Sequence, residues 1–159
     1  MMKIARRLNR EASVNLAQRR AWFVDLSITA ASVTWVGGVR PFVGQGGEAG
    51  TPGQPVYLDT TTNTYKLTDG DLDAASVCAG ILLDTMVSGR PCLIAPPGAV
   101  INIGATVTLG TIYVCSLAAG GVAPWADLST GDYVTILFIG ATSNIVELIC
   151  KRQYAGTHA

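Results

Sequence analysis

Short apolar runs separated by glycine-containing turns dominate the chain from residue 55 onward. The runs at 56–59 and 64–67 flank the polar connection 60–63, a pattern typical of a β-hairpin. Similar runs predict strands at 77–83, 91–95, 100–103, 106–109, 112–116, 132–139 and 145–151. The turns between them recur at the spacing of sandwiches and barrels. The sequence therefore predicts an all-β body, a jelly-roll-like β-sandwich or barrel.

The first 53 residues have a different pattern. Residues 1–20 carry a weak helical rhythm, and residues 22–26 and 33–36 are two brief strand-like runs. Residues 37–53 are rich in glycine and proline, which is typical of a linker or a long ordered loop. We expect three parts: an extended basic arm with a flexible connector over 1–53, a β-rich body over 54–151, and a frayed tail over 152–159.

Charge is divided unevenly along the chain. Residues 1–20 hold six of the eleven Lys and Arg residues against one acid, a net charge of +5. Residues 41–150 hold two cations against nine acids, a net charge of −7. A basic arm joined to an acidic, apolar body indicates a protein that contacts a large partner through its N-terminal end.

Three roles remain open for the basic arm: docking on an acidic protein surface, binding nucleic acid, or a solvated end without a partner. Its cations could neutralise phosphates, but the arm is short and no motif that reads DNA or RNA follows it. Aromatic residues follow instead, and aromatic residues with arginine are typical anchors of protein interfaces. We therefore favour docking on an acidic protein surface over binding of nucleic acid, and we assign that docking to Arg6, Arg7, Arg10, Arg19, Arg20, Trp22, Phe23 and Trp35.

Hydrophobic residues make up 49% of the chain and charged residues only 14%, against about 25% charged in an average soluble domain. Two explanations stay open: a strand-rich chain packed with Val, Ile and Ala, or apolar surface covered by sister subunits or a lattice. No apolar run approaches the ~18 residues of a membrane span, and no signal-peptide core follows the basic N-terminus. We expect no membrane partner and synthesis in the cytosol.

Candidate chemical groups are few. The cysteines, Cys78, Cys92, Cys115 and Cys150, match no zinc or redox spacing and have apolar neighbours, so we expect buried reduced thiols. The only histidine, His158, is the penultimate residue, which leaves Ser-His-Asp and Cys-His arrangements without their base. We expect no enzymatic activity and no cofactor.

Two loops suggest ligands only weakly. Asp69, Asp71 and Asp73 alternate as in a calcium loop, but Ala74 and Gly80 stand where an EF-hand needs Gly and Glu. A solvated acidic loop and a loose hard-cation site both remain open. The glycine-rich run 44–50 lacks the Lys and Ser/Thr of a phosphate-binding loop, so we interpret it as part of the flexible connector.

Two long stretches resemble small head proteins of tailed phages, the capsid decoration or cement proteins. They are VYLDTTTNTYKLTDGDLDAASVCAGILL at 56–83 and GAVINIGATVTLGTIYVCSLAAGGVAPWADLSTGDYVTILFIGATSNIVEL at 98–148. The similar features are a PVYLD…N…YKL hairpin, an Asp/Ala-rich loop, a GATVTLGTIYV strand pair and a GGVAP…DLSTGDYVT corner. The likeness covers residues 53–148, and residues 1–50 lie outside it.

The resemblance implies a β-rich domain that binds the outer surface of an assembled capsid as a homo-oligomer, a dimer or a trimer. The major capsid protein would be its partner and the virion its location, where it would stabilise the shell. A tail-fibre or tail-surface module is an alternative of the same class. From another class, the alternative is a carbohydrate-binding module in which an exposed Trp125 or Tyr133 stacks on sugar.

Overall fold

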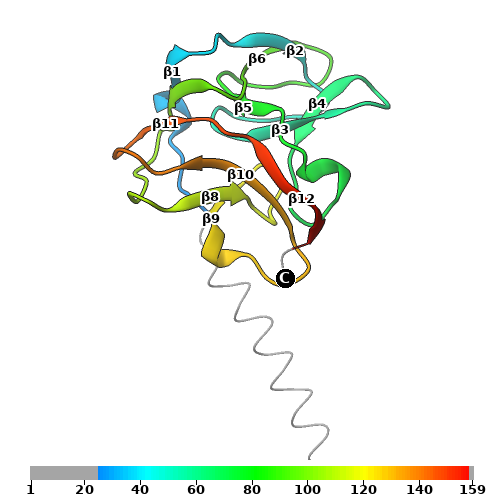
Figure 1. Ribbon diagram of the computed structural model, residues 1–159. Helices are drawn as coiled ribbons and strands as arrows, with labels where there is room; N and C mark the ends of the chain where they lie inside the picture. Colours follow the sequence, from blue (N-terminus) through cyan, green and yellow to red (C-terminus); the bar gives the residue numbers. More distant parts are fainter. Residues whose placement is uncertain (1–24, 158–159) are drawn as a thin grey trace, which may run out of the picture.

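The computed structural model describes residues 25–157, with side chains as far as Gln153. This part of the chain forms twelve strands in three antiparallel sheets and contains no α-helix (Figure 1). Three short 3-10 helices connect strands: Ala30–Ser32, Ala74–Ser76 and Trp125–Asp127. The prediction of an all-β sandwich is confirmed, whereas the basic arm lies outside the described residues.

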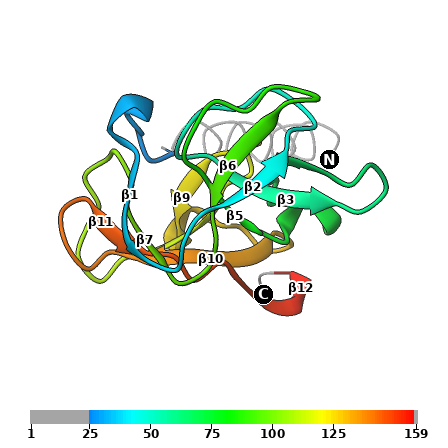
Figure 2. The same cartoon turned by 90° about the horizontal axis from the view of Figure 1, so that it is seen from above.

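The three sheets differ in size. The five-stranded sheet has the order β2 (Phe42–Gln45), β6 (Pro91–Ala95), β5 (Gly80–Leu82), β3 (Pro55–Asp59), β4 (Thr64–Leu67). The four-stranded sheet has the order β12 (Lys151–Thr157), β10 (Tyr133–Ile139), β8 (Ile112–Cys115), β9 (Val122–Pro124). The three-stranded sheet has the order β1 (Thr34–Gly38), β7 (Ala99–Asn102), β11 (Ile145–Glu147). Seen from above, the three-stranded sheet lies beside the five-stranded one (Figure 2).

The main hydrophobic core lies where the three sheets meet. Ile101 and Val146 reach it from the three-stranded sheet, Leu137 and Phe138 from the four-stranded sheet, and Ile81 from the five-stranded sheet. The neighbour of Ile81, Leu82, points to the other face and belongs to a second cluster with Val56, Met86, Cys92 and Ile94. A third, smaller cluster around Val114 and Val134 covers the outer face of the four-stranded sheet.

The predicted hairpin is confirmed almost residue for residue. Strands β3 and β4 pair from Val56–Leu67 to Asp59–Thr64, as the pattern at 56–59 and 64–67 indicated. The Asp59 carboxylate makes two contacts at this hairpin. It accepts a hydrogen bond from the Thr61 N–H at 2.9 Å and forms an ion pair with Lys66 at 2.6 Å. Asn63 adopts a left-handed φ of 54°, which asparagine tolerates better than most residues.

The predicted flexible connector is wrong for residues 42–45, because they form β2 and pair with β6. Glycine serves close packing there rather than flexibility. A Cβ on Gly44 would meet the ring of Tyr65 at 2.5 Å, and that ring also contacts Phe42 at a centroid distance of 5.7 Å. The aromatic pair thus covers a glycine in the middle of an edge strand.

Three further predictions differ from the structure. Residues 106–109 form a loop rather than a strand, because only Val107 is buried and the Thr108 N–H bonds the Tyr113 hydroxyl instead of a neighbouring strand. The short strand β9 was missed because its three residues follow two glycines. The tail predicted as frayed contains β12, which pairs with β10 and starts at Lys151.

No helix among residues 25–157 has the length and the apolar character needed to cross a bilayer.

The close approach of β5 to β6 gives a first prediction. A Cβ on Gly80 would overlap the Ala95 carbonyl oxygen and meet Ile94 at 2.7 Å, whereas a Cβ on Gly37 would meet nothing within 4 Å. We expect Gly80→Ala to lower the free energy of unfolding by about 1–3 kcal/mol because backbone must shift, and Gly37→Ala to change it by less than about 0.5 kcal/mol. Urea unfolding measures both. Equal stabilities of the two variants would contradict this packing.

The Asp59–Lys66 ion pair gives a second prediction. The hydrogen bond from Lys66, together with that from the Thr61 N–H, lowers the pKa of Asp59 from 3.8 to about 2. Because the folded-state pKa is depressed, the stabilisation is present above about pH 4 and is lost as pH falls toward 2. Lys66→Gln should therefore move the acid-unfolding midpoint to higher pH, and Asp59→Asn should flatten the pH dependence in this window. Circular dichroism followed from pH 7 to pH 2 measures these changes; identical acid profiles of all three proteins would refute the assignment.

Candidate docking surface

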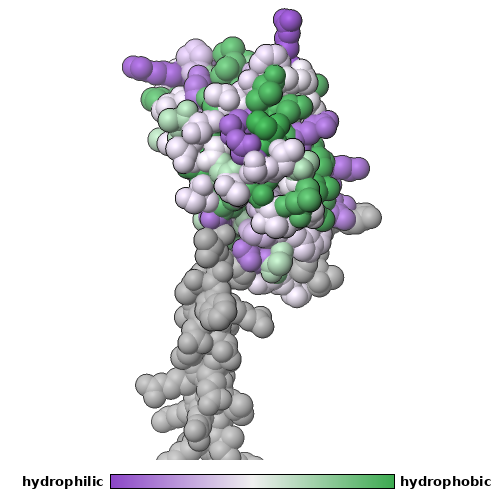
Figure 3. Space-filling model, turned by 90° about the vertical axis from the view of Figure 1, so that its left-hand side faces the viewer, coloured by the Kyte–Doolittle hydropathy of each residue, from purple (hydrophilic) through white to green (hydrophobic). Residues whose placement is uncertain are grey.

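The region of greatest functional interest is an exposed segment from β1 to β2. It presents Trp35, Val36, Val39, Arg40 and Val43, and we call these five residues the β1–β2 surface. The four apolar members are 41–70% exposed, with Val43 at the upper limit. Figure 3 views the molecule from the side of β1 and shows hydrophobic side chains gathered on the upper part of this face.

Local geometry explains why these side chains face solvent. The register between β1 and β7 shifts between Trp35 and Gly37, so Val36 occupies a bulge and has no partner residue on β7. No residue of β1 is buried. The strand is instead held by its backbone pairing and by the Trp35 indole N–H, which donates to the Val39 carbonyl oxygen at 3.1 Å.

A tight turn joins the two strands of the surface. Gly38 has a φ of +71°, and a Cβ there would overlap the Gly98 carbonyl oxygen and meet the Val100 nitrogen at 3.1 Å. Glycine is therefore required for the chain to bend closely against β7. The bend places Val39 and Arg40 at the surface, directly before β2 begins.

Both strands of this surface are at sheet edges. Within the described residues, β1 pairs only with β7, and β2 pairs only with β6. An edge strand has unpaired backbone groups, and proteins usually protect long apolar edges from other chains. Tryptophan and arginine are enriched at protein interfaces, and the exposed Val36, Val39 and Val43 add apolar area to this segment.

The structure describes one of the residues that the sequence assigned to docking. Trp35 lies on the β1–β2 surface, while Arg6, Arg7, Arg10, Arg19, Arg20, Trp22 and Phe23 lie outside the described residues. Sequence reasoning missed Val36, Val39, Arg40 and Val43. The signal was the lack of alternation between buried-type and polar residues in 34–43, which a strand with one face in the core would have shown.

Two carboxylates of the acidic loop have partners within the chain. The Asp69 carboxylate accepts a hydrogen bond from the Asp71 N–H at 2.9 Å, and Asp73 forms an ion pair with Arg152. The Arg152 guanidinium also lies 5.2 Å from the centre of the Tyr133 ring. Within residues 25–157, no group of three or more His, Cys, Asp or Glu side chains is arranged to hold a metal ion.

The aromatic residues of the sugar-binding alternative are less exposed than expected. Trp125 is half-buried against the cluster of Val114, Leu128 and Val134. Tyr133 is half-buried as well, with Arg152 over its ring. Sugar stacking needs an open ring face, so neither residue favours that alternative.

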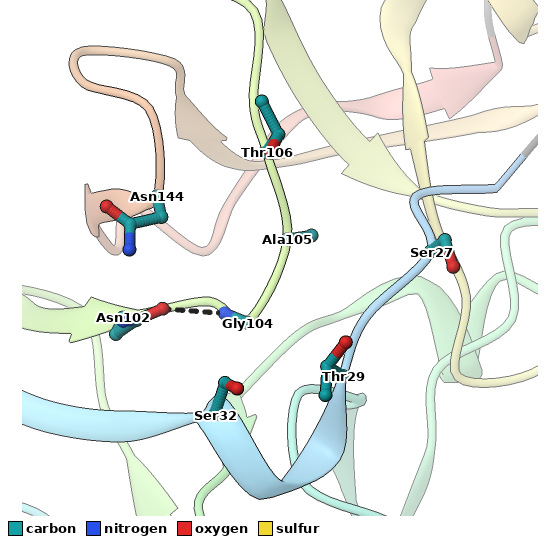
Figure 4. A pocket seen from close by; sticks show the side chains of 8 residues that line it. All are labelled: Ser27, Thr29, Ser32, Asn102, Gly104, Ala105, Thr106 and Asn144. Atoms are coloured by element: carbon teal, nitrogen blue, oxygen red, sulfur yellow. Dashed lines mark hydrogen bonds between the residues drawn. The ribbon is translucent and has the colours of Figure 1, made fainter.

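A polar hollow of about 390 Å³ lies between the segment that precedes β1, the loop that follows β7 and the loop that precedes β11 (Figure 4). Its polar lining comes from Ser27, Thr29, Ser32, Asn102, Thr106 and Asn144. The Asn102 side-chain oxygen already accepts a hydrogen bond from the Gly104 N–H at 2.9 Å. The hollow has hydroxyl and amide groups but no titratable side chain in its lining, so it could offer hydrogen bonds to a neutral ligand.

No protein-family model, no curated protein and no solved structure matches the chain.

Proposed function

We propose that the protein is a non-enzymatic structural protein of a phage virion that binds the outer surface of the assembled capsid and stabilises it. The observation that carries the proposal is the β1–β2 surface, in which exposed apolar residues and Arg40 lie on two consecutive sheet-edge strands and the turn between them. The resemblance of residues 53–148 to capsid decoration proteins supplies the identity of the partner.

The proposed mechanism is selective binding to the assembled shell. Burying the exposed part of a valine such as Val36 or Val43 would contribute about 1 kcal/mol, and the basic residues of the arm would add charge contacts with an acidic capsid surface. Because these contacts span neighbouring capsid subunits, they form only when the shell is assembled. Mass action then opposes disassembly, and a dimer or trimer multiplies the effect through avidity.

A tail-fibre or tail-surface module is the second candidate. The same edge strands and apolar residues would also serve assembly into a fibre, since both uses need an exposed interface. The two functions differ in what is lost: removal of a decoration protein weakens the shell, whereas removal of a tail module impairs adsorption to the host.

Particles assembled without this protein provide the direct test. They should form normally but release their genome at lower temperature or under weaker osmotic shock than complete particles. Adding back the purified protein should restore resistance. Equal breakage of the two kinds of particle would refute stabilisation, and normal stability with impaired adsorption would favour the tail module.

The β1–β2 surface can be tested separately from the arm. We expect the double substitution Val36→Asp and Val43→Asp to weaken binding to bare capsids by at least about tenfold, since two buried apolar contacts are replaced by charges that must be desolvated. Val77→Asp is the matched control, because Val77 is 48% exposed but lies outside this surface. Sedimentation with bare capsids measures binding, and circular dichroism verifies the fold. Equal losses in both proteins would contradict a specific role for this surface.

The arm has its own test. Deleting residues 1–20 should leave a soluble protein with an unchanged β-type spectrum and sharply weaker capsid binding. Replacing Arg6, Arg7, Arg10, Arg19 and Arg20 by Gln should give a milder loss, largest at low ionic strength because salt screens exposed charges. Full capsid binding by the truncated protein would refute a role for the arm and would leave the β1–β2 surface as the proposed contact.

A further inference from the structure

Three segments that are distant in the sequence enclose the polar hollow. Ser27, Thr29 and Ser32 come from the segment that precedes β1, residues 102–106 from the end of β7 and the loop after it, and Asn144 directly precedes β11. Figure 4 shows the labelled side chains arranged around the second of these segments. The hollow is therefore formed only when the chain is folded.

Backbone hydrogen bonds hold the three segments together. The Thr29 N–H donates to the Gly104 carbonyl oxygen at 2.7 Å, and the Ile103 N–H donates to the Asn144 carbonyl oxygen at 3.0 Å. Gly104 has a φ of +72°, and a Cβ there would lie 2.5 Å from the Thr29 carbonyl oxygen, so the close approach requires glycine. Because its walls are bound to one another, the hollow is preformed, and a ligand would not have to order them.

The side chains of the lining have hydrogen-bonding groups available for a ligand. Four hydroxyl groups make no hydrogen bond to any group in the described part of the chain; they belong to Ser27, Thr29, Ser32 and Thr106. The side-chain oxygen of Asn102 accepts a hydrogen bond from the Gly104 N–H at 2.9 Å, and that of Asn144 lies 3.4 Å from the Ser143 hydroxyl. These contacts use the oxygens and leave the two carboxamide NH2 groups as donors.

The chemistry of the lining selects the class of ligand. None of the described residues around the hollow is charged, so a charged ligand would lose hydration without gaining an ion pair. An apolar ligand would cover hydroxyl and carboxamide groups and leave them without partners. A neutral ligand with several hydroxyl groups avoids both costs, because hydroxyl groups donate and accept, as the lining does. The volume of about 390 Å³ lies within the range of about 300–1,000 Å³ that is typical of small-molecule sites.

We propose that the hollow binds a neutral saccharide through hydrogen bonds with the hydroxyl and carboxamide groups of its lining. Trp125 and Tyr133, which the sequence suggested for sugar stacking, are not part of this site, and no other aromatic ring is among its described lining residues. Hydrogen bonds without stacking give weak binding, with a dissociation constant on the order of 1 mM. The hollow shares no residue with the β1–β2 surface, so the proposal does not rest on capsid binding.

Titration of the full-length protein, followed by NMR, tests the site. The probes are D-glucose, D-galactose and N-acetyl-D-glucosamine, and at least one should shift the backbone amide signals of Gly104, Ala105, Thr106 and Asn144 in a saturable way. D-glucuronate is the matched charged probe, and it should bind at least about threefold more weakly than glucose because the lining offers no cation to its carboxylate. No saturable shift with any neutral sugar, shifts spread evenly over the protein, or equal or tighter binding of glucuronate would each overturn the proposal.

Two substitutions remove hydrogen-bonding groups from the hollow and nearly keep its shape. Thr106→Val replaces a hydroxyl by a methyl group, and Asn144→Leu removes a carboxamide but keeps the backbone carbonyl that binds the Ile103 N–H. Each should raise the dissociation constant of the sugar by about threefold to tenfold. Thr130→Val is the matched control, because Thr130 is exposed and lies outside the hollow, and it should bind as the wild type does. Unchanged sugar binding by both hollow variants would refute the assignment.

Discussion

Strand β10 is the element on which the rest of the fold depends. It pairs with β8 on one side and β12 on the other, and both of its faces are covered. Leu137 and Phe138 enter the main core together because the register with β8 shifts beside them, while Val134 and Ile136 contribute to the cluster on the outer face. The Thr135 hydroxyl bonds the Ser76 carbonyl oxygen, so even its polar residue is used internally. Apart from Ile139 at its end, β10 therefore has little free surface, and its side chains serve mainly to hold the sheets together.

The β1–β2 surface has the opposite character. Strand β1 adds no buried side chain to any cluster, and its contribution to folding comes from backbone pairing and from the bend at Gly38. Substitutions at Val36 or Val43 therefore remove little that holds the body together. Side chains that folding does not need, yet that remain large and apolar, are the ones expected at an interface. This separation makes docking and stability independently measurable.

A strand could be predicted from the sequence where its own residues alternate between apolar and polar types or form an apolar run. The hairpin of β3 and β4 did, through alternation and a polar turn, and it was predicted nearly to the residue. Strand β2 did not, because the role of Gly44 is visible only when the Tyr65 ring lies on it. Strand β12 depends on its pairing with β10 and has no apolar run. Of the β1–β2 surface, only Trp35 was singled out from the sequence. The exposure of Val36, Val39 and Val43 follows from a bulge and from edge positions, and its only trace in the sequence is the lack of alternation in 34–43.

The N-terminal residues and the β-rich body carry net charges of opposite sign. Residues 25–157 hold ten acids against five bases, a net charge of −5, and two of those acids are already paired, Asp59 with Lys66 and Asp73 with Arg152. Residues 1–24 carry a net charge of +5. Since the β1–β2 surface contains only one charge, Arg40, its contacts would be mainly apolar and little affected by salt, whereas contacts made by the arm would weaken as salt increases. The salt dependence of binding therefore reports which of the two regions carries the interaction, without any change to the sequence.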